Sequence, residues 1–155
     1  MRVELVWAGQ AVADQVEAAF EIGGAVRRLD GSRMRTAEEL WAEFARRLDF
    51  PPYFGHNWAA LEDCLTDLDW LRAPSYLIVI DSADQILAEE QDPLVGLFGD
   101  LLVRACRHWA LPIEDGEWWD RPGIDFHVLL HASSAEAADR LRSRWSSAGV
   151  ELAVP

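Results

Sequence analysis

The sequence contains no lysine, and its 14 basic residues are all arginines. They stand against 27 aspartates and glutamates, so the 155-residue chain has a formal charge of −13 at pH 7. Proteins that bind DNA or RNA neutralise phosphates with a basic surface, so we expect no nucleic-acid partner. Two interpretations of the acidic surface stay open: it only keeps the protein solvated, or it steers a cationic partner inward.

Cysteine is also scarce, and no long hydrophobic run is present. Cys64 and Cys106 are too few and too far apart for a disulfide scaffold or a zinc site, so we expect reduced, buried thiols. The longest apolar runs, YLIVI and FHVLL, have the length of strands rather than of a membrane span. The first residues lack a cleavable apolar stretch, which argues against a signal peptide. We therefore expect a cytoplasmic protein without a membrane contact.

Tryptophan, by contrast, is abundant: the chain has eight, and half of its residues are hydrophobic. A chain of this length buries about 68–70% of the surface that its unfolded form exposes, which suffices for a stable core without disulfides or metals. We therefore expect residues 1–155 to form a single domain that is monomeric when free.

Strands and helices are predicted to alternate along the chain. Apolar runs and alternation predict strands at 2–7, 25–29, 76–81, 124–131 and 150–154. Apolar positions spaced by three and four predict helices at 11–20, 37–48, 58–68, 93–109 and 135–148. The runs at 76–81 and 124–131 lack a polar face, as parallel strands covered on both sides do. The pattern predicts an α/β fold in which helices flank a small, mainly parallel sheet.

Polar side chains precede four of the predicted helices. The expected N-caps are Thr36, Asn57, Asp92 and Ser133. Thr36 and Ser133 each stand three residues before a glutamate, which is the pattern of a capping box.

The segment FPPYFGHNWAALEDCLTDLDWL, residues 50–71, is the most unusual in the chain. Its two prolines end the preceding helix, because neither can donate a backbone hydrogen bond. On the helix that follows, successive residues are separated by 100°, so apolar and polar positions separate onto two faces. Cys64 is expected to face the core, and Asp63 and Asp67 are expected to face solvent.

These positions argue against catalysis and metal binding. Asp63 and Cys64 point in different directions and cannot act together on one metal or substrate. His127 and His131 share a strand face but lie about 13 Å apart, too far to bind one zinc ion. We therefore predict no catalytic residue, no metal ligand and no cofactor. A hydrolase that uses Asp63 and a histidine is the least favoured alternative.

Binding of another protein is better supported. Tyr53, Phe54 and Trp58 come just before the exposed acids, and aromatic residues beside a lone acid are typical of interface hot spots. A merely solvated helix face is the alternative.

The pattern PxYFGxNxxALxDCLT in this segment resembles the central loop and helix of the barstar family, which are inhibitors of the ribonuclease barnase. The matching residues are Pro51, Tyr53, Phe54, Gly55, Asn57, Ala60, Leu61, Asp63, Cys64, Leu65 and Thr66. A looser similarity extends over about 25–131, which leaves 1–24 and 132–155 as additions. The resemblance implies a three-layer barstar-like α/β fold with extra N- and C-terminal elements.

The resemblance also implies a function: an intracellular inhibitor of a ribonuclease, of immunity or antitoxin type, whose loop and helix plug the enzyme's cationic active site. Asp63 would take the place of an RNA phosphate, and Asp100 would be a weaker contact. The full expected contact set is Tyr53, Phe54, Gly55, His56, Asn57, Trp58, Ala59, Glu62, Asp63, Asp67 and Asp100.

Three residues depart from the family pattern: His56 replaces a glutamate, Ala59 an acid and Glu62 a tryptophan. These exchanges imply a secreted or toxin ribonuclease other than barnase. The alternative is an acidic adaptor for a basic non-nuclease protein, or for a toxin that is not a ribonuclease. The role of the loop at 112–123 is also undecided, because Trp118 and Trp119 could form a second contact or a lid over the core.

Overall fold

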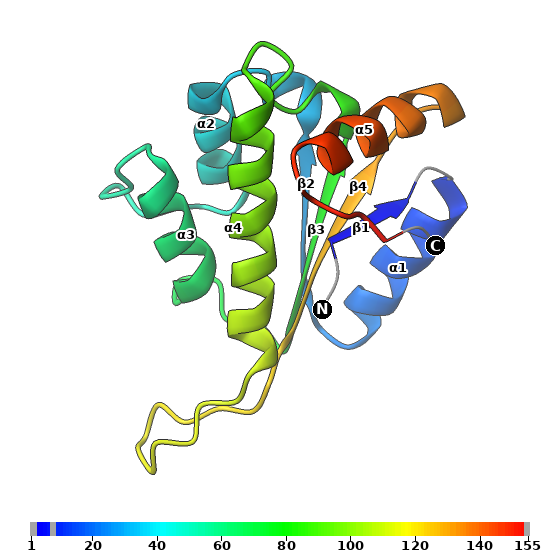
Figure 1. The fold of residues 1–155 in the computed structure, drawn as a ribbon. Coiled ribbons are helices and arrows are strands. Elements are labelled where there is room, and N and C mark those ends of the chain that lie inside the picture. Colours follow the sequence, from blue (N-terminus) through cyan, green and yellow to red (C-terminus); the bar gives the residue numbers. More distant parts are fainter. Residues whose placement is uncertain (1–2, 7–8, 154–155) are drawn as a thin grey trace.

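The computed structural model describes residues 3–6 and 9–153, and these form a parallel sheet with helices on both faces (Figure 1). The sheet order is β1-β4-β3-β2, and every neighbouring pair is parallel. The strands are β1 Val3–Val6, β2 Ala25–Asp30, β3 Ser75–Asp81 and β4 Asp125–His131. The α-helices are α1 Gly9–Glu21, α2 Ala37–Arg47, α3 Trp58–Asp67, α4 Asp92–Ala110 and α5 Ala135–Ser147. Two short 3-10 turns, Gly31–Arg33 and Ala83–Gln85, complete the set.

Three layers are visible in Figure 1: α1 covers one face of the sheet, and α2, α4 and α5 cover the other. Helix α3 packs on α4, outside the layer that contacts the sheet. The predicted three-layer α/β fold is confirmed. The N-terminal addition completes this architecture, because β1 pairs with β4 and α1 packs over β2 and β3.

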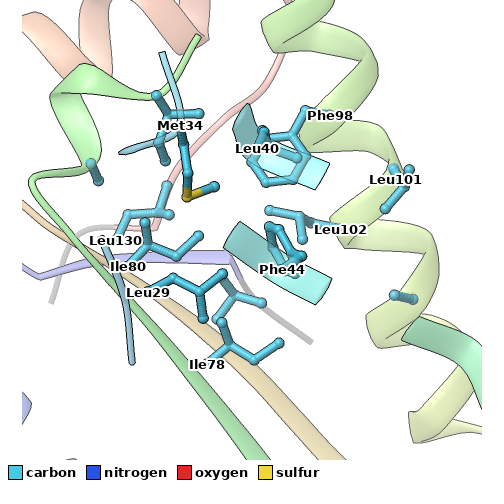
Figure 2. Packing of buried hydrophobic residues seen from close by; sticks show 14 of the residues in the cluster. Leu29, Met34, Leu40, Phe44, Ile78, Ile80, Phe98, Leu101, Leu102 and Leu130 are labelled. Atoms are coloured by element: carbon cyan, nitrogen blue, oxygen red, sulfur yellow. The ribbon is translucent and has the colours of Figure 1, made fainter. Parts of the chain in front are cut away.

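The larger core lies between the sheet and the helices α2 and α4 (Figure 2). Strand residues such as Leu29, Ile78 and Leu130 meet Phe44 of α2 and Phe98 of α4 there. All residues of β3 from Ser75 to Ile80 are buried, as expected of a strand covered on both faces. A smaller cluster under α1 contains Val12, Leu77, Val79 and Leu129.

The predicted capping residues are partly correct. Thr36 and Glu39 form a complete capping box at the start of α2. The predicted box at Ser133 is wrong, because Ser134 caps α5 and its Oγ accepts the N–H of Ala137 at 3.1 Å. Asp92 is likewise not a cap: Gln91 occupies that position, and Asp92 is the first residue of α4. Both errors shift a cap by one residue.

The strand predicted at 150–154 is also wrong over the described part of that range. Residues 150–152 have no strand structure, and Ala153 lies in an isolated bridge. Gly149 takes a left-handed φ of 87° after α5, and the N–H of Val150 then bonds to the carbonyl of Trp145 at 2.9 Å. Val150 packs against Gly99 of α4, so its hydrophobic side chain is buried by a helix rather than by the sheet.

A polar cluster joins the C-terminal ends of three strands. Arg28 of β2 donates two hydrogen bonds to Asp81 of β3, at 3.0 Å from Nε and 2.7 Å from Nη2. His131 of β4 lies 3.0 Å from the same carboxylate through Nδ1. Partial burial would raise the pKa of Asp81, but the hydrogen bonds from Arg28 and His131 outweigh it and lower this pKa below its ordinary value of 3.8.

Replacing Asp81 with asparagine is expected to lower the free energy of unfolding by about 1–2 kcal/mol at pH 7, because charge-assisted bonds are lost. A carboxyl group with a lowered pKa stabilises the folded state above pH 3.8 and loses this effect as the pH falls through the lowered value. The difference between Asp81→Asn and the wild type should therefore shrink below about pH 3.8. Urea unfolding at pH 7 and pH 3 measures it, and equal differences at both would contradict the expectation.

Candidate functional site

The loop between α2 and α3 is held by backbone hydrogen bonds at both of its bends. The N–H of Phe50 bonds to the carbonyl of Ala45 at 3.0 Å, where the chain leaves α2. The N–H of Phe54 bonds to the carbonyl of Pro51 at 3.0 Å, which closes a turn over the two prolines. The proline rings restrict φ within this turn, so its backbone has little conformational freedom.

Two of the predicted contact residues are buried in whole or in part. Phe54 is only 6% exposed, and its ring lies 4.9 Å from that of Phe50 and 4.7 Å from that of His56. Trp58 is half-buried and packs edge-on against Trp41, with ring centroids 5.4 Å apart. Phe54 therefore offers little area to a partner, and Trp58 only part of its ring. Their main effect in the structure is to fix the loop on the core.

Asn57 is committed to the start of α3. Its Oδ1 accepts the N–H of Ala60 at 2.8 Å, and its Nδ2 donates to the carbonyl of Gly55 at 3.1 Å. This confirms the predicted N-cap. A side chain at Gly55 would place its Cβ 3.0 Å from that Nδ2, so the loop is narrow here. His56, with a left-handed φ of 47°, is exposed, and its Nδ1 lies 3.1 Å from the carbonyl of Phe54.

The two faces of α3 separate as the sequence predicts. Leu61, Cys64 and Leu65 are buried, whereas Asp63 and Asp67 are exposed. Among the residues that the structure describes, neither aspartate has a side-chain hydrogen bond or an ion pair. Both carboxylates are therefore available to an external cation.

Tyr53 and Ala59 are exposed beside this acidic face. The Tyr53 side chain is 74% exposed, the largest exposed aromatic surface in the loop. Ala59, in the first turn of α3, is also exposed and adds no charge. An aromatic ring and a small side chain can approach a partner closely and exclude water around an ion pair.

Glu62 has an ion-pair partner that sequence reasoning missed, and this partner borders the same surface hollow as Asp100. Arg104 of α4 forms an ion pair with the half-buried Glu62 of α3. Asp100 lies one turn earlier on α4, is exposed, and borders a hollow together with Arg104. The sequence could not show this pair, because it depends on how α3 packs on α4. Glu62 is thus partly neutralised within the chain, unlike Asp63.

Neither cysteine of the chain is activated as a nucleophile. Burial, followed by the charges of Asp67 and Asp63, raises the pKa of the Cys64 thiol, which disfavours a nucleophilic thiolate. Burial raises the pKa of Cys106 to about 12.

Within the described ranges, no group of three or more potential ligands is placed to hold a metal ion. Among the helices described there, none is long and apolar enough to cross a membrane.

The chain is similar to known proteins. Residues 24–131 match the family model described as Barstar (barnase inhibitor). A stretch of 51 residues is 39% identical to the "Putative ribonuclease inhibitor YrdF" of Bacillus subtilis (strain 168). That stretch makes up 33% of this chain and 54% of the relative, so the similarity spans about half of its length.

A solved structure of the ORC2 protein from Aeropyrum pernix, in ADPNP-ADP complexes, also resembles the chain. The two share 15% sequence identity at a TM-score of 0.49, over 99% of this chain and 42% of the other. A likeness this weak has no bearing on function.

Proposed function

Because the chain belongs to the barstar family, we propose that it inhibits a ribonuclease by covering the enzyme's cationic active site with its loop and α3. Family membership and the name of the relative indicate an inhibitor rather than an enzyme. The proposed partner is a secreted or toxin ribonuclease, and the inhibitor protects the cytoplasm of the cell that makes both.

The exposed, unpaired carboxylate of Asp63 is the observation that supports this proposal most. Enzymes that cleave RNA bind phosphate with cationic side chains, and a carboxylate can accept the same charge-assisted hydrogen bonds. The N-cap of Asn57 and the buried stripe of α3 hold Asp63 in place without using its carboxylate oxygens. Because the backbone of α3 is already ordered, only the side-chain rotamer of Asp63 has to be fixed on binding, which keeps the entropic cost small.

The remaining acids act at longer range. With a formal charge of −13, the chain attracts a basic enzyme before contact. We expect the association rate constant to fall about tenfold when NaCl is raised from about 0.02 M to about 0.5 M, because salt screens this attraction. The dissociation rate constant should change much less. Stopped-flow fluorescence measures both, and an association rate independent of salt would refute electrostatic steering.

Cleavage of a fluorogenic RNA provides the test of function. The purified chain is titrated into barnase and into any small nuclease encoded beside its gene. Complete inhibition of at least one enzyme at a 1:1 molar ratio supports the proposal. Unchanged cleavage by every enzyme in the set rejects it. A basic protein that binds the Asp63 face without losing nuclease activity would instead favour the adaptor.

A further inference from the structure

A narrow arm, residues 111–123, extends from the end of α4 away from the rest of the molecule (Figure 1). Ile113 and Arg121 pair in an antiparallel bridge, with N···O distances of 2.8 and 3.1 Å. At the tip, Gly116 takes a left-handed φ of 80°, and the carboxylate of Asp120 accepts the N–H groups of Asp115 and Gly116 at 2.9 and 2.8 Å. The arm is therefore a hydrogen-bonded structure with its own turn.

Arg121 fixes the base of the arm to α4. Its guanidinium donates to the carbonyls of His108, Trp109, Leu111 and Pro122 at 3.1–3.3 Å. It also lies 4.7 Å from the centre of the Trp109 ring, in a cation–π contact. These five contacts of the Arg121 side chain hold the arm in a defined orientation. The positive charge of Arg121 therefore interacts within the protein rather than with a partner.

The arm carries two neighbouring tryptophans that do not cover the core. Trp118 is 85% exposed and Trp119 is 47% exposed. Of the two roles that the sequence left undecided, these exposures disfavour a lid over the core. Trp119 donates its indole N–H to Asp115 at 3.0 Å, and its ring meets that of Trp118 edge-on at 5.5 Å. Large aromatic rings exposed on a rigid support are typical of contact surfaces.

The arm and the C-terminal end of α3 enclose a cavity of about 620 Å³. Both tryptophans and Tyr76 line it, together with Asp67 of α3. Other charged groups in its wall already have partners: Arg72 pairs with Asp69, Arg121 is bonded to backbone carbonyls at the base of the arm, and Asp120 holds the tip. Among the residues that the structure describes, the Asp67 carboxylate has no such partner. The cavity thus combines an available anion with exposed aromatic faces.

We propose that this cavity binds an arginine side chain of the ribonuclease, and that the arm is a second contact for the same enzyme. A guanidinium stacks on indole rings and forms ion pairs with carboxylates, so both available features of the cavity fit it. Asp67 lies one helical turn after Asp63 on the same exposed face, so the two contacts form one continuous surface. This inference rests on the proposed function for the identity of the partner.

The first test uses a small cation and needs no enzyme. N-acetyl-arginine methylamide is titrated into the whole protein while tryptophan fluorescence and indole N–H signals are followed, and the uncharged citrulline analogue serves as control. We expect the arginine probe to bind about tenfold more tightly than the citrulline probe, and Trp118→Ala and Asp67→Asn each to remove most of that difference. Phe20→Ala, at an exposed aromatic residue of α1, should change nothing. Equal binding of both probes, or no effect of either cavity variant, overturns the proposal.

The second test uses whichever ribonuclease the chain inhibits. We expect Trp118→Ala to raise the dissociation constant about tenfold, mainly through faster dissociation, with Phe20→Ala again neutral. If Asp63→Ala weakens inhibition and Trp118→Ala does not, the arm proposal fails while the function stands. If no enzyme is inhibited, the function fails, and selective, Trp118-dependent binding of the arginine probe still supports the cavity. Sedimentation of the free chain tests whether a second copy of this chain occupies the cavity instead of the ribonuclease. A dimer that Trp118→Ala dissociates would overturn the proposal.

Discussion

Replacing Asp63 with alanine is expected to weaken binding of the inhibited ribonuclease by about 2–5 kcal/mol, the usual cost of removing one partner of a buried charge pair. The barnase–barstar complex is itself a standard example of such costs, and its largest values exceed this range, so the magnitude is the general one for buried charge pairs and is not calculated for this chain. The cost is high because the enzyme's cations stay buried without their anion. The free energy of unfolding should change by less than about 0.5 kcal/mol, since Asp63 is exposed and its side chain makes no hydrogen bond or ion pair with a described residue.

Titration calorimetry and urea unfolding measure the two quantities on the same variant. Glu17→Ala is the matched control, because it removes one exposed carboxylate from α1 on the opposite face of the sheet. It should reduce the association rate slightly and leave the dissociation rate unchanged. Equal losses of affinity and stability in Asp63→Ala would show that the side chain supports the fold, and would remove the main support for the proposed function.

Replacing Trp145 with alanine is expected to lower the free energy of unfolding by about 3–5 kcal/mol, the usual cost of removing a large aromatic side chain from a packed core. Trp145 lies in α5, beyond the range matched by the family, and is only 1% exposed. Its ring lies 6.0 Å from Phe98, and Phe98 in turn lies 5.9 Å from Phe44 and 6.1 Å from Trp58. A C-terminal addition thus packs into the same core that supports the loop between α2 and α3.

Ser143→Ala, at an exposed position of the same helix, is the control and should change the free energy by less than about 0.5 kcal/mol. Denaturant unfolding followed by circular dichroism and by fluorescence tests whether both variants unfold in one transition. A loss below about 1 kcal/mol in Trp145→Ala, or a separate early transition, would mean that α5 is an appendage. The prediction of a single domain over the whole chain would then be wrong.

The fold was largely predictable because its signals are local. The buried run at 76–81, the capping box at Thr36 and Glu39, and the apolar stripe of α3 each follow from residues close together in sequence. The same local geometry placed Asp63 on the exposed face. The misplaced cap at Ser133 arose where two adjacent serines offer equivalent side chains, and only the observed backbone selects Ser134.

What the sequence did not show depends on contacts between distant segments. Periodicity does not distinguish an aromatic residue that faces a partner from one that anchors a loop, so Phe54 was assigned to the contact surface although its ring packs on Phe50. The pair between Glu62 and Arg104 joins residues 42 positions apart. The cavity between Asp67 and the arm likewise requires the position of both elements. These features determine which carboxylates stay available to a partner.

Pairing of β1 with β4 has a practical consequence for anyone who shortens the chain. Val3–Val6 supply the hydrogen-bonding neighbour along one side of β4, from Val128 to His131. A fragment limited to the family-matched residues 24–131 would leave that side of β4 unsatisfied and uncover Leu77 and Val79 beneath the missing helix. The unpaired edge of β4 could then form hydrogen bonds with the same edge of another copy. Removing the residues before 24 should therefore give aggregates rather than a smaller folded protein.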